Sequence, residues 1–318
     1  MSSVLPVPRL ARCPRAPFVT LHRQRIPERA RVPLLKASQW LESMIAYPRL
    51  LAECSELARE VIADLRTEGV HVTSVERLLG GAAPAYCKAM ARASEFLAEC
   101  SVRKHPAWRV QAASTDLLPG ELLARLPEFY LFGLNAQILF LAEQYLRVPI
   151  AYHGAVFRHS FADGHEVGPR LWHKDCEDFH VLRTVVYLND VAADGGPFEY
   201  IPRHCSQNAR DAFGNTPRRT NDKMQALVPR RQWKRCLGPA GTVVLADSAR
   251  IFHHESLPRG KDRSVIMMGH SSRRPKELSL ALSHFPVEAN TTALMRIVAP
   301  EHYPHVFGWR AACPRRPP

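Results

Sequence analysis

Long apolar runs, a secretory leader, internal repeats and a dinucleotide fingerprint are all missing from this sequence of 318 residues. No stretch approaches the roughly 18 consecutive apolar residues of a transmembrane helix. The first residues lack the apolar core of about 7–15 residues that a secretory signal carries. With 46% hydrophobic and 23% charged residues, the composition is typical of a globular protein without a membrane span.

Paired cysteines are missing as well. The eight cysteines are scattered, and none belongs to a Cys-x-x-Cys pair. A chain of this length can bury a core without disulfides, so we interpret these residues as reduced thiols and predict a cytoplasmic protein. Cys176 follows Asp175 directly and should point the other way along an extended segment, so we do not make it a ligand.

Acidic residues are in short supply, because 43 lysines and arginines face 30 aspartates and glutamates, a net charge of +13. Such a charge favours anionic partners. Residues 1–35 contribute seven arginines against one glutamate. Elsewhere the excess is spread thinly, without the interleaved basic and aromatic residues of a nucleic-acid platform, so binding of nucleic acid is not predicted.

The chain divides by texture into a tail and one domain. We expect residues 1–35, rich in proline and arginine, to be a flexible tail, with a transit peptide as the alternative. Within a single domain at 36–318, residues 36–148 should be mostly helical. Apolar spacing predicts helices at 48–66, 85–100 and 121–146, the last broken at Pro127, and Thr73 or Ser74 as a helix cap. Residues 106–119 are expected to be irregular.

Short runs of β-formers follow from residue 149 to 275, separated by turn signals. The predicted strands are 150–161, 171–175, 181–188, 198–202, 242–246 and 264–269. Residues 206–232 are polar and should cross the mouth of the sheet as an insertion, and 276–318 should form a C-terminal extension. Helices followed by short strands predict an α+β, mainly β protein: a double-stranded β-helix, or cupin-like jelly roll, with a helical layer from the N-terminal half.

A His-x-Asp pair, His173 and Asp175, ends one apolar run. Residues two apart on a strand project from the same face, so this imidazole and carboxylate can meet at one point. Such a pair can also be ordinary surface residues. A third donor follows 78 residues after Asp175, in the pair His253–His254. Neighbours on a strand face opposite sides, so only one of them can join; we predict His253, which comes directly after an apolar pair.

Two histidines and one carboxylate on one face of a metal ion are typical of non-heme Fe(II) oxygenases. Ten residues after His253 comes Arg263, at the start of an apolar strand, where an inward side chain needs an anion. A guanidinium can anchor the far carboxylate of a dicarboxylate whose other end chelates iron. Arg158 is a second candidate for this contact, although it can equally face outward.

Four segments together resemble the phytanoyl-CoA dioxygenase family of Fe(II)/2-oxoglutarate oxygenases, over roughly residues 135–270. The segments are 171–178, 186–191, 195–202 and 241–248, the last leading to His253 and Arg263. The resemblance implies that His173, Asp175 and His253 bind Fe(II), and that Arg263 holds the distal carboxylate of 2-oxoglutarate. Arg203–His204 and Gly241–Thr242 depart from the usual family residues, so the substrate does not carry over.

The function that this resemblance implies is hydroxylation or desaturation of an unactivated C–H bond with O₂, releasing succinate and CO₂. Retention of Asp175 argues against halogenation, which needs that position for a halide. The positive charge suits a small carboxylated metabolite in biosynthesis, an acyl-CoA or an acyl group on an acidic carrier protein. Two alternatives remain open: a cupin-type metal enzyme that does not use 2-oxoglutarate, and a non-catalytic basic binding protein.

Overall fold

A seven-stranded antiparallel sheet is the largest element of the fold. This computed structural model describes residues 28–46, 55–99, 102, 104–208 and 218–310. In order across the sheet, the strands are β1 (Val70–Ser74), β8 (Thr242–Asp247), β5 (Leu182–Tyr187), β10 (Arg263–Ser272), β4 (Ile150–Ser160), β3 (Ser114–Leu117) and β2 (Trp108–Val110). Residues 106–119, expected to be irregular, therefore contain β2 and β3, which extend the sheet beside β4.

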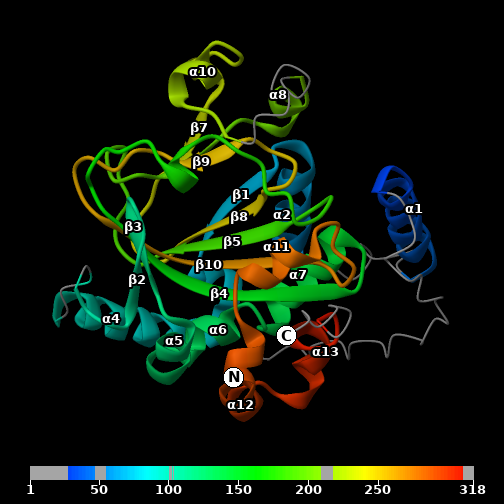
Figure 1. The fold of residues 1–318 in the computed structure, drawn as a ribbon, viewed down its shortest axis with the longest axis horizontal. Helices are drawn as coiled ribbons and strands as arrows, with labels where there is room; N and C mark the ends of the chain where they lie inside the picture. The colour runs from blue at the N-terminus through cyan, green and yellow to red at the C-terminus, as the bar shows by residue number, and fades with distance from the viewer. Residues whose placement is uncertain (1–27, 47–54, 100–101, 103, 209–217, 311–318) are drawn as a thin grey trace.

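A second, smaller sheet lies against the first (Figure 1). Its strands are β7 (Lys234–Cys236), β6 (Phe198–Tyr200) and β9 (His253–Glu255). A bridge from His173 to His253 adds a fourth extended segment beside β9, although residues 171–175 do not form the full strand that we predicted. The segment makes two backbone hydrogen bonds to β9, both in that bridge, and further backbone hydrogen bonds join it to Arg219 and Ser248.

The order of the segments confirms the predicted fold class. Eight extended segments lie between residues 150 and 272. The first (β4), eighth (β10), third (β5) and sixth (β8) are neighbours in the large sheet. The second (the segment with His173), seventh (β9), fourth (β6) and fifth (β7) form the small sheet in the same way. The chain thus winds back and forth between two sheets, which is the arrangement of a double-stranded β-helix.

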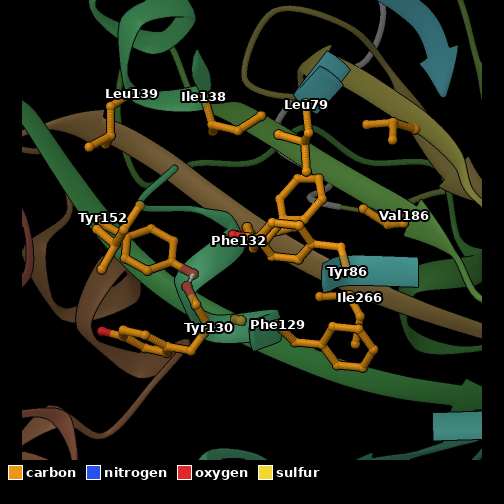
Figure 2. Close-up of a cluster of buried hydrophobic side chains, with 14 of the residues drawn as sticks. Leu79, Tyr86, Phe129, Tyr130, Phe132, Ile138, Leu139, Tyr152, Val186 and Ile266 are labelled. Carbon is orange, nitrogen blue, oxygen red and sulfur yellow. Dashed lines mark hydrogen bonds between the residues drawn. The ribbon is translucent and has the colours of Figure 1, made fainter. Parts of the chain in front are cut away.

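Alternation along the strands separates two cores. Val186 and Ile266 are paired neighbours whose side chains join the main apolar cluster on the outer face of the large sheet. Figure 2 shows them next to Tyr86, Phe129 and Phe132 from the helical layer. The alternate residues of the same strands, such as Val185, Tyr187, Val244 and Val265, point between the two sheets instead.

The helical layer comes from the N-terminal half, as predicted. Its helices are α2 (Glu56–Thr67), α3 (Val75–Leu79), α4 (Ala83–Glu99), α5 (Pro119–Arg125), α6 (Pro127–Phe132) and α7 (Ala136–Leu146). The Ser74 hydroxyl accepts a hydrogen bond from the Arg77 amide and caps α3. Ser55 caps α2 in the same way, so this helix begins later than predicted from the apolar spacing; residues 48–54 lie outside the described ranges.

The two ends of the described chain form further helices. Helix α1 (Glu28–Ala46) includes residues 28–35, which we had assigned to a flexible tail; residues 1–27 are outside the description. Gln39 of α1 donates to the Ser272 hydroxyl, which ties the helix to the end of β10. The C-terminal helices are α11 (Leu278–Ser283), α12 (Val287–Ile297) and α13 (Tyr303–Val306). None of the helices within the described ranges is long and apolar enough to span a bilayer.

The segment 206–232 lies over the small sheet. It contains the second half of α8 (Arg203–Asn208) and all of α10 (Asn221–Gln225), both at the top of Figure 1, while residues 209–217 are not described. Met224 and Val228 pack against Trp172 in a separate buried cluster. Trp172 therefore faces this insertion.

Candidate metal centre

Three side chains that the sequence predicted as ligands converge between the sheets. Asp175 Oδ1 lies 3.8 Å from His173 Nε2 and 3.9 Å from His253 Nε2. The chain brings them together through two backbone hydrogen bonds, each 3.0 Å long, between His173 and His253. The three donor atoms all lie within 4.8 Å of one another. His173 and Asp175 thus point to the same place, as we predicted from the alternation of side chains along an extended segment.

The separations are close to those of a coordination sphere. With metal–ligand bonds of about 2.1 Å at right angles, neighbouring donor atoms stand about 3.0 Å apart. The same Asp175 oxygen faces both imidazoles, so each donor must move by less than about 1 Å to bind one ion. Movement on this scale needs only small side-chain rotations.

The imidazoles present the correct nitrogen. His173 Nδ1 donates to the Leu171 carbonyl at 2.7 Å, and His253 Nδ1 lies 3.4 Å from the Ile251 carbonyl. Because a carbonyl oxygen only accepts, the proton on Nδ1 leaves the Nε2 lone pair of each ring available to a cation. The rings are thus fixed in the tautomer that a metal ion requires.

Burial sets the protonation states. Burial lowers the pKa of His173 to about 3, and it also lowers the pKa of His253. Burial alone would raise the pKa of Asp175, but the positive charge of Arg183 lowers it well below the usual value. At neutral pH the site therefore offers two neutral imidazoles and one carboxylate, the states in which these groups bind metal ions.

Arg183 positions the carboxylate, and sequence reasoning missed it. Its Nε and Nη2 donate to Asp175 Oδ2 at 3.1 and 2.6 Å, which turns Oδ1 toward the imidazoles. Nη2 also donates to Glu177 Oε1 at 2.9 Å. A Cβ at Gly269, opposite on β10, would stand 2.7 Å from Arg183 Nη1, so glycine leaves the space that this guanidinium fills. The signal in the sequence was a charged residue within an otherwise apolar strand.

His253, and not His254, faces the site. His254 is buried on the opposite side of β9, stacked on Trp172 with ring centroids 4.0 Å apart. Its Nδ1 and Nε2 lie 2.9 and 2.8 Å from the Arg170 carbonyl and from Glu199 Oε2. His254 thus has a structural role, with both ring nitrogens occupied.

The two arginines predicted to anchor a co-substrate carboxylate are bound by carboxylates of the protein. Arg263 donates from Nη2 to Glu255 Oε2 at 2.6 Å and from Nη1 to the Gly196 carbonyl at 2.6 Å. Arg158 holds both oxygens of Asp116, at 2.7 and 2.9 Å. Both arginines do need an anion, as the sequence indicated, but the chain itself supplies it. In this arrangement neither guanidinium offers a complete site for 2-oxoglutarate.

Two other clusters of ligand types occur in the described part of the chain. One is Glu60, Asp64 and His71, which includes an exposed glutamate at the surface. The other is His153, Glu177 and His284, where Glu177 Oε1 already accepts from His284 Nε2 at 2.5 Å and from Arg183. Glu177 already binds a guanidinium and a ring nitrogen of its own cluster, and the positive charge of Arg183 opposes a second cation there, whereas in the first site Arg183 occupies only the Asp175 oxygen that faces away from the imidazoles.

Similar solved structures share part of this fold. They include HygX from Streptomyces hygroscopicus with nickel, 2-oxoglutarate and hygromycin B bound (14% identity, TM-score 0.45, 67% of this chain and 87% of that one). EctD from S. alaskensis with bound Fe gives 18% identity, a TM-score of 0.48 and coverages of 70% and 81%. The carbocyclase SnoK from nogalamycin biosynthesis gives 16%, 0.46, 70% and 86%. The sequence matches no protein-family model and no curated protein.

Proposed function

We propose that this protein is an oxygenase that depends on Fe(II) and 2-oxoglutarate and hydroxylates or desaturates an unactivated C–H bond. The observation that carries the proposal is the convergence of His173, Asp175 and His253 within a double-stranded β-helix. Two neutral nitrogen donors and one carboxylate suit Fe(II), and their placement on one side leaves the other side open. When bound, iron supplies the reactivity toward O₂ that amino-acid side chains lack.

Other residues of the chain would orient the metal ligands and line the site. Arg183 holds Asp175 so that one oxygen points to the cation, and the backbone carbonyls of Leu171 and Ile251 hold the two rings. Phe198 stacks on the His253 ring with centroids 5.3 Å apart and supplies an apolar wall. These contacts hold the ligands in place before the metal ion or substrate binds.

The substrate class rests on charge. A net charge of +13 favours an anionic small molecule, an acyl-CoA or an acyl group on an acidic carrier protein. Nucleic acid is not among the proposed partners, since no basic-aromatic platform is present in the sequence.

A second candidate is a metal-dependent enzyme of the cupin type that does not use 2-oxoglutarate. The pairing of Arg263 with Glu255 and of Arg158 with Asp116 favours it, because both predicted anchors carry a protein carboxylate. A third, a non-catalytic basic binding protein, would have no use for the metal ligands.

Succinate formation tests the proposal. Protein is incubated with Fe(II), 2-oxoglutarate and O₂, and succinate is measured for the wild type, His173→Ala and His302→Ala, a histidine outside the three clusters. We expect succinate from the wild type and His302→Ala and none from His173→Ala. If the wild type binds Fe(II) but forms no succinate with any anionic substrate tried, the second candidate replaces the first. If it binds no metal, only the third remains.

A further inference from the structure

Glu255 is a buried acid on the same strand as one of the proposed ligands. His253 begins β9 and Glu255 ends it, so their side chains project from one face, about 7 Å apart along the strand. Only 6% of Glu255 is exposed. Its Oε2 accepts from Arg263 Nη2 at 2.6 Å and from the Ser160 hydroxyl at 3.0 Å, and its Oε1 accepts from Arg170 Nε at 3.3 Å. A carboxylate of the chain thus lies beside the proposed metal centre.

Arg158 and Arg263, which each pair with a protein carboxylate, use their guanidinium groups differently. Nε and Nη2 form one edge of a guanidinium, which matches the two oxygens of a carboxylate. In Arg158 this edge is fully used, because both atoms donate to Asp116. In Arg263 only Nη2 donates to Glu255, and the buried Nε finds no acceptor among the residues that the structure describes. Arg263 therefore retains half of a carboxylate site.

Charge around Arg263 is balanced before any ligand enters. Arg263 and Arg170 are each ion-paired with Glu255, and Arg170 is also paired with Asp163. Two positive charges meet two negative ones, so an incoming carboxylate would add an uncompensated negative charge. It would also have to displace Glu255 from Nη2. Arg170 and Ser160 can keep Glu255 in place when Arg263 releases it.

We propose that Glu255 competes with the distal carboxylate of 2-oxoglutarate for Arg263 and thereby weakens binding of the co-substrate in the resting protein. This inference rests on the proposed function, because it assumes a co-substrate whose far carboxylate reaches Arg263. Removing the charge of Glu255 weakens its hydrogen bond to Nη2, so that a carboxylate can displace it, and leaves a net positive charge beside the Nε–Nη2 edge. A ligand without a distal carboxylate gains nothing from this change.

Binding to the full chain loaded with Ni(II) tests the competition without turnover. Dissociation constants are measured by calorimetry for 2-oxoglutarate and for 2-oxopentanoate, which has the same chain length but no distal carboxylate. We expect Glu255→Gln to bind 2-oxoglutarate at least tenfold more tightly than the wild type, about 1.4 kcal/mol, with 2-oxopentanoate unchanged. Adding Arg263→Gln to this variant should remove the gain. Glu121→Gln, at an exposed ion pair, should match the wild type.

Each other result has one meaning. Equal affinity of the wild type and Glu255→Gln for 2-oxoglutarate overturns the competition and leaves the proposed function standing. An equal gain for 2-oxopentanoate also overturns it, because Arg263 is then not the contact. If neither protein binds 2-oxoglutarate while both bind Ni(II), the co-substrate of the proposed function falls as well. If Glu255→Gln fails to fold, Glu255→Asp, which draws the charge back by one methylene, should give an intermediate gain, and no gain overturns the inference.

Discussion

Replacing His173 with alanine should abolish the stabilisation that a divalent metal ion gives to this protein. The two imidazoles and Asp175 are held by hydrogen bonds to the backbone and to Arg183, so little rearrangement opposes binding. An ion that binds only the folded state stabilises it in proportion to the logarithm of its concentration. Without His173, one nitrogen and one oxygen donor remain, and the affinity should fall far below the concentration used.

The size of the effect follows from linkage. At a free metal concentration of one hundred times the dissociation constant, the gain in the free energy of unfolding is about 2.7 kcal/mol. For a chain larger than about 250 residues, each kcal/mol shifts the melting temperature by about 2 °C, so the wild type should gain about 5 °C. His173→Ala should gain less than about 1 °C under the same conditions.

Thermal melts of metal-stripped protein, with and without Co(II), Ni(II) or anaerobic Fe(II), measure this shift. His284→Ala removes a ligand type from the neighbouring cluster of His153 and Glu177, and it should keep the shift of the wild type. His302→Ala controls for the loss of any histidine. The reasoning is refuted if His173→Ala keeps the full shift, and a loss in His284→Ala alone would move the ion to the other cluster.

Three further predictions concern stability. Burial lowers the pKa of His270 to about 4, against about 6.5 when unfolded, so the unfolded chain takes up the proton first and stability falls as the pH drops from 6.5 to 4. Denaturant titrations should show this loss reduced by about 3 kcal/mol in His270→Gln, and an unchanged loss contradicts it. Gly154→Ala should cost roughly 2–4 kcal/mol, because φ is +104° and a Cβ would stand 2.4 Å from a phenylalanine side chain. Gly168→Ala, in open space, should cost less, and equal costs would refute the steric argument. Arg183→Gln should cost about 3–5 kcal/mol in the metal-free protein, since it removes the guanidinium that pairs with the buried Glu177 and the partly buried Asp175. Arg77→Gln, at an exposed pair, should cost under about 1 kcal/mol, and similar values would count against burial as the cause.

The sequence predicted the fold wherever one periodicity dominated. The strands at 150–161, 181–188 and 242–246 are rich in β-formers, and the structure differs from their predicted ends by only one residue. The stretch 106–119 failed because β2 and β3 are short strands held by pairing with β4 and with each other, which no local pattern records. The arginine-rich composition of 1–35 likewise hid the start of α1, which is tied to β10 through Gln39.

The same limit applies to the candidate site. Alternation places His173 and Asp175 on one face without knowledge of any contact, because it depends only on the backbone. Which cation pairs with which anion depends on the tertiary structure. Arg183 reaches Asp175 from β5 of the large sheet, and its place within a predicted strand indicates a buried charge without identifying its partner.

The alternation of side chains, which identified the ligands, also applies to Glu255. His253-x-Glu255 is a His-x-acid pair of the same form as His173-x-Asp175, so Glu255 had to face the space between the sheets. An acid buried there needs a cation, just as the inward Arg263 needs an anion, and the two lie only eight residues apart across one connection. The requirement that buried charges be paired therefore joins them before any ligand is considered. A co-substrate carboxylate that reached Arg263 would then compete with Glu255, because Glu255 already accepts from Nη2 of that guanidinium.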